Sequence, residues 1–222
     1  MPHGPTPVQW RRSARARRIS LRIDPREGSV VVTLPTRAAR SAGKALVMDH
    51  AGWIAERLAR LPCAAPFADG ALFPVNGVPV RIAHVPGMRG VRLDGGVLEV
   101  GGAAEFLTRR VTDWLRALAR KQLGGAAVAK AGLAGLRVRR VVVKDTRTRW
   151  GSCTADGTLM FSWRLVMAPP DVQDYVVGHE VAHLRHMDHS ARFWALVGEL
   201  TVHRSAATGW LVVSGAGLMR TG

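Results

Sequence analysis

The sequence predicts an α+β fold, and three observations lead to this prediction. Residues 17–101 are rich in short β-prone runs, separated by glycine, proline and asparagine turns. Residues 102–204 contain longer segments in which apolar residues recur at helical spacing. One of these helical segments carries a group of histidines and a glutamate. We therefore expect a β-rich amino-terminal half, followed by a core that contains a sheet and a histidine-bearing helix.

The amino-terminal elements are predicted from local patterns. Residues 1–16 carry prolines and then arginines, and we expect them to form a basic, flexible start. Residues 17–34 contain two β-branched or alternating runs around a turn, which predicts a β-hairpin. Apolar residues at helical spacing predict one long helix over residues 36–61, with a break near Gly43 or Gly52.

The remaining elements are predicted in the same way. Three short β-prone runs between residues 72 and 100 are separated by turn signals, and we expect them to extend the amino-terminal sheet. Residues 205–222 are expected to form a carboxy-terminal tail. Within the core, the patterns predict a helix over residues 105–131, strands over 138–143 and 158–167, and helices over 172–186 and 190–200.

Charge and composition restrict the partners and the compartment. The chain of 222 residues has 32 Lys and Arg against 16 Asp and Glu, a formal net charge of +16. This charge would attract nucleic acid, nucleotides or acidic proteins, although a solvated basic surface is the plainer interpretation. Two cysteines, Cys63 and Cys153, are too few for a cysteine-based zinc cluster. With no membrane-spanning apolar run and no secretory signal, we expect no membrane partner and a cytoplasmic location.

The strongest functional pattern is H-E-x-x-H, formed by His179, Glu180 and His183. Residues four apart project from one face of a helix, so two imidazoles can occupy adjacent corners of a zinc tetrahedron. Glu180 is then placed to reach a metal-bound water and to take its proton as general base. The pattern predicts a zinc-dependent hydrolase with one Zn²⁺ ion per chain.

A catalytic zinc ion usually has three protein ligands, so the sequence must supply one more. His186 would lie about 10 Å along a continuous helix from His179, too far to share one ion. His189 follows a short segment that could turn back under the metal, and Ser190 after it suits the cap of the next helix. We expect His189 to be the third ligand, with Glu199 on the following helix as the alternative.

Two longer blocks show that the sequence resembles the YgjP-like metallopeptidases. The first is RTRWGSC, residues 147–153, followed by a glycine turn and a strand ending in WRL. The second is YVVGHEVAHLRHMDHSARFW, residues 175–194. The resemblance implies that His189, in the position of an N-H-S triplet, is a zinc ligand beside the two motif histidines. Asp188 replaces the usual asparagine and adds a negative charge beside the site.

The resemblance also implies a zincin-like catalytic core, in which the active-site helix crosses beneath an antiparallel sheet. The edge strand of such a sheet lines the substrate cleft, and residues 158–167 are our candidate for that strand. A more distant similarity to SprT-like proteases, which act on proteins attached to DNA, agrees with the basic charge of this chain.

Several residues beside the motif have two interpretations. Arg147 and Arg149 could contact substrate or stabilise developing negative charge, or they could support the sheet. Tyr175 lies one helical turn before His179 and could donate to an oxyanion, although packing is the commoner use of such a residue. For Trp150 and Cys153 we favour structural roles.

Three functions remain open on the sequence. In a metallopeptidase, zinc polarises the scissile carbonyl of a protein or peptide substrate and Glu180 directs water onto it. A zinc-dependent phosphohydrolase acting on nucleoside triphosphates or another polyanion is the alternative, because the same water could attack phosphorus. A structural zinc in a nucleic-acid binding module is disfavoured by Glu180, since such a site needs no general base.

Overall fold

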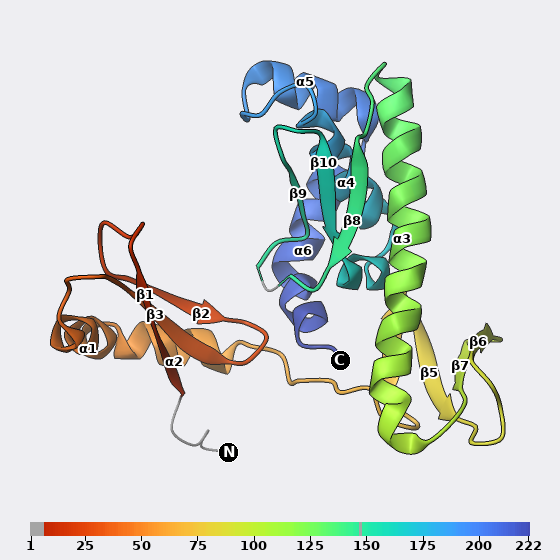
Figure 1. Ribbon diagram of the computed structural model, residues 1–222, viewed down its shortest axis with the longest axis horizontal. Helices are drawn as coiled ribbons and strands as arrows, with labels where there is room; N and C mark the ends of the chain where they lie inside the picture. The colour runs from red at the N-terminus through yellow and green to blue at the C-terminus, as the bar shows by residue number, and fades with distance from the viewer. Residues whose placement is uncertain (1–6, 147) are drawn as a thin grey trace. The chain divides into compact units, whose positions relative to one another are not determined.

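The computed structural model describes residues 7–146 and 148–222 and confirms the α+β class (Figure 1). The chain divides into two compact units, one ending at Ala64 and the other running from Ala65 to Gly222. Each unit has its own hydrophobic core. Arg147, predicted as a substrate contact, lies outside the described residues.

The first unit is a three-stranded sheet with two helices on one face. Its strands are β1 (Val8–Ser13), β2 (Ser20–Asp24) and β3 (Ser29–Pro35), in the order β1-β3-β2. The predicted hairpin is therefore present as β2 and β3. Strand β1, which pairs in parallel with β3, occupies part of the segment expected to be a flexible start. It is ordered because Val8 and Trp10 pack against the core of Val30, Val32 and Leu34.

The helical segment predicted for residues 36–61 is broken near Gly52, one of the two expected places. Its two parts are α1 (Arg40–Asp49) and α2 (Ala51–Ala59), and the break falls at His50. Gly43 lies buried inside α1, where a Cβ atom would come within 2.7 Å of the Trp10 ring. This glycine allows α1 to approach the sheet closely, a purpose that the helical periodicity alone does not reveal.

The second unit begins with a sheet of its own, so the prediction that these strands extend the amino-terminal sheet was wrong. The strands are β4 (Leu72–Val75), β5 (Val78–His84), β6 (Val91–Asp94) and β7 (Val97–Val100), in the order β4-β5-β7-β6. Their inward side chains, among them Phe73, Ile82 and Leu98, belong to the same core as the long helix that follows. Burial of these apolar side chains explains why the strands form a separate layer.

The long helix α3 (Leu107–Leu133) follows a short 3-10 turn, η1 (Ala104–Phe106), and runs past both sheets of the second unit (Figure 1). It buries a residue at every fourth position, which keeps one face toward the core. Alanines at positions 119, 127 and 131 in this row allow neighbouring elements to come close. The buried row is Leu107, Val111, Leu115, Ala119, Leu123, Ala127 and Ala131.

The other sheet of the second unit contains β8 (Arg140–Lys144), β9 (Gly151–Cys153) and β10 (Thr158–Ser162), in the order β8-β10-β9. It is mixed rather than wholly antiparallel, because β10 pairs in parallel with β8 and antiparallel with β9. β10 is thus the central strand, and the expectation that residues 158–167 form the edge beside the cleft is corrected: β9 is that edge. Residues 163–167 form a 3-10 turn, η2 (Trp163–Met167), instead of continuing the strand.

Three helices complete the second unit: α4 (Pro170–Ala182), α5 (Ala191–Leu200) and α6 (Arg204–Met219). The residues expected to form a tail are therefore mostly helical. Helix α6 packs against α4 and η2, and Ala207 and Leu218 are buried in the shared core. Among the described residues, no helix is both long enough and apolar enough to cross a membrane.

The buried Arg164 forms an ion pair with Asp145, the partly exposed residue that follows β8. Arg164 of η2 is fully buried and donates to the Asp145 carboxylate and to the carbonyl of Thr221. Its guanidinium also lies 4.0 Å from the centroid of the Trp163 ring. Trp150, which directly precedes β9, packs against Gly215 of α6, in keeping with the structural role predicted for it.

Candidate metal site

The histidine-bearing helix α4 begins as the sequence predicts and ends earlier. Pro170 occupies its first turn, where a missing N–H costs nothing. The helix was expected to reach residue 186 but ends at Ala182, with His183 as its cap. A tight turn follows, in which the amides of Arg185 and His186 donate to the Ala182 carbonyl. This early end lets the chain turn back, so that His189 approaches the motif.

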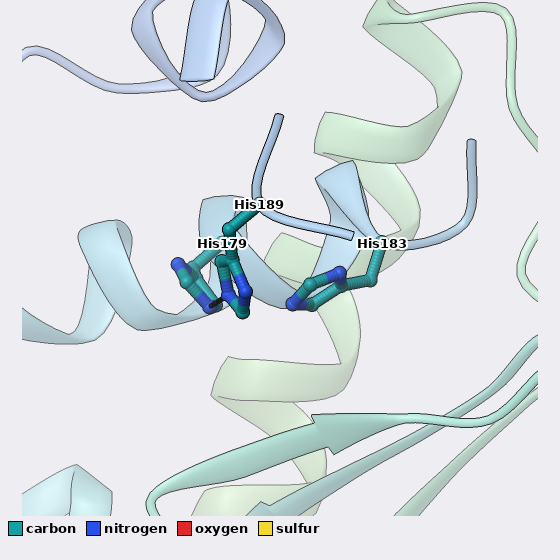
Figure 2. Close-up of side chains that lie close together, drawn as sticks. All are labelled: His179, His183 and His189. Carbon is teal, nitrogen blue, oxygen red and sulfur yellow. Dashed lines mark hydrogen bonds between the residues drawn. The ribbon is translucent and has the colours of Figure 1, made fainter. Parts of the chain in front are cut away.

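Three imidazoles meet at this turn (Figure 2). The candidate ligand atoms of His179, His183 and His189 all lie within 4.8 Å of one another. The Nε2 atoms of His179 and His189 are 3.3 Å apart. Two of these histidines come from α4 and its cap, and the third from the loop before α5. The structure thus brings together the three residues predicted as metal ligands.

The other predicted third ligands do not join the cluster. Glu199 is exposed on α5 and does not belong to the described group of residues that could hold a metal ion. His186 contributes through its backbone instead, because the Nδ1 atom of His183 lies 2.9 Å from the His186 carbonyl oxygen. A carbonyl only accepts, so this Nδ1 carries the proton and leaves the Nε2 lone pair of His183 available to a metal.

Packing holds the rings in place. Phe193, fully buried on α5, stacks on His183 with ring centroids 4.5 Å apart. It also contacts His179 and His189 edge-on, at centroid distances of 5.0 and 4.8 Å. The hydroxyl of Ser190 caps α5 by accepting from the Phe193 amide, as predicted for this serine. One helix start therefore positions both His189 and the ring beneath the cluster.

The electrostatics favour neutral imidazoles. Burial lowers the pKa of His179 to about 4, with further lowering from the neighbouring His183 and His189. Burial also lowers the pKa of His183. A metal ligand must be deprotonated, so protons compete weakly for these two nitrogens at neutral pH.

Glu180 is 6% exposed and lies under strand β9. Burial raises its pKa to about 7, while the charge of Arg149 opposes the rise. A Cβ atom added at Gly151 of β9 would come within 2.6 Å of the Glu180 Oε1 atom. The sheet edge and the carboxyl group are therefore in direct contact, and only glycine leaves room for that approach. Sequence reasoning identified the Glu180 carboxylate but not this role of Gly151.

Two adjoining cavities open onto these residues. One, of about 240 Å³, contains Tyr175 in its wall, and the other, of about 300 Å³, contains Cys153 and all three histidines. Burial raises the pKa of the Cys153 thiol to about 11, so this cysteine is not a thiolate at neutral pH. Shared by both walls are Arg149, Gly151, His179 and Glu180.

An α+β core in which a buried helix presents histidines and a glutamate beneath a sheet edge defines a class of metal-dependent hydrolase. Comparison with known proteins agrees. The family model described as YgjP-like, metallopeptidase domain, matches residues 17–212, and the chain belongs to this family. It is therefore assigned to the metal-dependent peptidases.

Other comparisons are sparse. No curated protein shows a significant match to the chain. Among solved structures, the chain is similar to the crystal structure of the metallopeptidase zymogen of Pyrococcus abyssi abylysin, at 15% sequence identity and a TM-score of 0.37. That match covers 40% of this chain and 92% of the other.

Proposed function

We propose that the protein is a zinc peptidase in which His179, His183 and His189 hold the ion and Glu180 is the general base. The observation that carries this proposal is the convergence of three imidazoles beside a buried carboxyl group whose pKa is raised to about 7. A metal site that serves only structure has no use for such a carboxyl group.

The donor set fits zinc. Zn–N bonds of about 2.0–2.1 Å in a tetrahedral arrangement place two ligand nitrogens about 3.3–3.4 Å apart. The Nε2 atoms of His179 and His189 are separated by 3.3 Å. Three neutral imidazoles leave a fourth position for water or substrate, the pattern typical of catalytic rather than structural zinc.

The residues of the chain then have distinct tasks. Zinc supplies a Lewis acid that polarises the substrate carbonyl and lowers the pKa of water. Glu180 accepts a proton from the attacking water and passes it to the nitrogen of the leaving amine. Burial raises the pKa of this carboxyl group in the metal-free site, so it holds a proton more strongly than an exposed glutamate does. The hydroxyl of Tyr175, in the wall of the smaller cavity, is proposed to donate to the carbonyl oxygen as negative charge develops.

Strand β9 is proposed to bind the peptide as an added strand. The Thr154 amide donates to the Thr158 carbonyl and the Ser162 amide to the Trp150 carbonyl, so every second pair of the β9–β10 ladder is hydrogen-bonded. In this alternation the backbone N–H and C=O groups of Gly151 and Cys153 point away from β10. Within the described residues, no other strand pairs with that side of β9. An extended peptide bound there would pass directly over Glu180.

The test compares peptide and phosphate-ester chemistry in one experiment. Purified protein is assayed against unstructured casein peptides and against a panel of nucleoside triphosphates, with Glu180→Gln as the blank. We expect peptide cleavage by the wild type, loss of about 100-fold or more in the variant, and one zinc per chain in both. Hydrolysis of nucleotides alone would replace this proposal with the phosphohydrolase alternative.

Metal content provides the matching control. His179→Ala is expected to lose zinc, whereas Glu199→Gln, which removes an exposed carboxylate of α5, is expected to retain both zinc and activity. A wild-type protein that folds fully and cleaves peptides after complete removal of metal would contradict the assignment of the cluster.

A polyanionic partner is proposed for the first unit. Residues 1–64 hold twelve Lys and Arg against four Asp and Glu, a net charge of +8, half that of the chain. Five arginines in and after β1 are exposed. Arg12 donates to the backbone carbonyls of Thr36 and Ala38, and the other four are Arg11, Arg15, Arg17 and Arg18. Such a cluster suits nucleic-acid phosphates, and binding would release counterions.

Fluorescence anisotropy with labelled single- and double-stranded DNA at several salt concentrations tests this partner. Changing the four arginines to glutamine should reduce the slope of log affinity against log salt by about 3. The matched control changes four exposed arginines of the second unit, Arg81, Arg89, Arg120 and Arg137. Equal loss of slope in both variants would show a diffuse charge effect and no dedicated surface.

A further inference from the structure

Two arginines near the site have no carboxylate partner among the described residues. Arg149 lines both cavities, and Arg204, the first residue of helix α6, stacks on Trp194 beside the histidine cluster. Both are exposed. Among residues 7–146 and 148–222, neither forms an ion pair. Glu180 is the one acidic residue among the described residues that line the two cavities.

The position of Arg204 is set by an aromatic ring. Its guanidinium carbon lies 3.6 Å from the centroid of Trp194, a close cation-π contact. The same ring lies 5.6 Å from His189 and 5.8 Å from His179, measured between centroids. Arg204 is thus one ring away from the proposed metal ligands. Because it rests on Trp194, less side-chain freedom is lost when it binds an anion.

The charges of both arginines act on groups that line the cavities. Burial raises the pKa of the Tyr175 hydroxyl, and the positive charge of Arg204 opposes that rise. In the same way, Arg149 opposes the rise in the pKa of Glu180.

We propose that Arg149 and Arg204 select substrates with an acidic side chain close to the scissile bond. This inference rests on the proposed peptidase activity and adds its substrate class. A peptide added to β9 would carry its side chains past Arg149, and those beyond the cluster would pass the Trp194–Arg204 pair. Guanidinium groups bind carboxylates through paired N–H donors, a geometry that a lysine ammonium does not offer.

The expected size of the preference follows from exposure. Both guanidinium groups contact solvent, so each should favour a Glu-containing peptide over its Gln counterpart by roughly two- to fivefold in kcat/KM. The preference should shrink as ionic strength rises, because exposed ion pairs are screened by salt. A peptide with lysine at the same position should be cleaved more slowly than the Gln peptide.

The experiment uses quenched fluorogenic peptides that differ at one position, with Glu, Gln or Lys at each of the two residues on either side of the cleaved bond. The readout is the ratio of kcat/KM for Glu and Gln peptides in the zinc-loaded, full-length protein. Arg204→Gln should bring this ratio close to one at the peptide positions nearest α6. Arg204→Glu should make the Lys peptide the best substrate at those positions. Arg149→Gln should bring the Glu-to-Gln ratio close to one at other peptide positions, those nearest β9. Arg120→Gln removes an exposed charge of α3 and should leave every ratio unchanged.

The outcomes separate this inference from the proposed function. Cleavage of the peptides with equal rates for Glu, Gln and Lys would overturn the substrate class while leaving the peptidase intact. A uniform fall for all peptides in Arg204→Gln, with the wild-type ratio preserved, would show that Arg204 only supports Trp194. Failure to cleave any peptide by a zinc-loaded wild type would contradict the peptidase itself.

Discussion

Replacing Glu180 with glutamine should stabilise the metal-free protein at alkaline pH, although it abolishes catalysis. Glu180 is 6% exposed, and burial raises its pKa from 4.5 to about 7. A buried carboxyl group of this kind is more stable protonated than charged. Glutamine has nearly the same shape and never carries the charge.

The magnitude follows from proton linkage. Below pH 4.5 the carboxyl group is protonated in both the folded and the unfolded chain, so wild type and variant should be equally stable. Between pH 4.5 and about 7 the unfolded chain has released this proton while the folded chain still holds it, so the stability of the wild type falls across that interval. Above that pH the full difference of about 2.5 pKa units applies, which corresponds to about 3 kcal/mol.

Calorimetry in the presence of a chelator measures the effect. At pH 8 the melting temperature of Glu180→Gln should exceed that of the wild type by about 6–12 °C, and at pH 4.5 the two should coincide. Glu199→Gln, which removes an exposed carboxylate from α5, should show no such pH-dependent gain. Equal melting temperatures of Glu180→Gln and wild type at pH 8 would refute the raised pKa that we assign to this buried carboxyl group.

Three further substitutions test the framework around the site. Gly151→Ala places a methyl group against Glu180 and should lower kcat/KM by about 100-fold while the zinc content is unchanged. Wild-type kinetics in this variant would show that strand β9 can shift to make room for the methyl group. Asp145→Ala removes the carboxylate that accepts from the buried Arg164 and should lower the free energy of unfolding in urea by about 3 kcal/mol. A loss under about 1 kcal/mol would show that this ion pair contributes little to stability. Ser190→Ala removes the cap of α5 and should lower the free energy of unfolding in urea by about 1 kcal/mol. Zinc binding should also weaken, because His189 is adjacent to this serine. An unchanged zinc affinity would show that the cap does not help to position His189.

Local patterns were sufficient to predict that His179, Glu180 and His183 lie within about one helical turn of one another. The spacing of His179 and His183 requires only a helix, because residues four apart share a face. Pro170 and Ser190 mark helix starts. Proline lacks the backbone N–H that the first turn leaves without a partner, and the serine hydroxyl accepts a hydrogen bond from a backbone N–H of the first turn. These features depend on neighbours within one or two turns, so the linear pattern contains the information needed to predict them.

Strand pairing was not predictable in the same way. The β-prone runs between residues 72 and 100 are visible in the sequence, but whether they join the first sheet or form their own depends on which apolar surface they cover. Burial against α3 decides this, and α3 lies later in the chain. The assignment of β10 to the sheet centre and of β9 to its edge likewise depends on hydrogen bonds between segments that local periodicity does not distinguish.

Sequence patterns therefore identify the chemical groups, the helix that carries the first two histidines and the family to which the chain belongs. The tertiary structure decides how they act together. It places Gly151 against Glu180, stacks Phe193 beneath the imidazoles and brings Arg204 next to Trp194. Each of these contacts joins residues that are far apart or lie on different elements, and it forms only because the elements bury a common core.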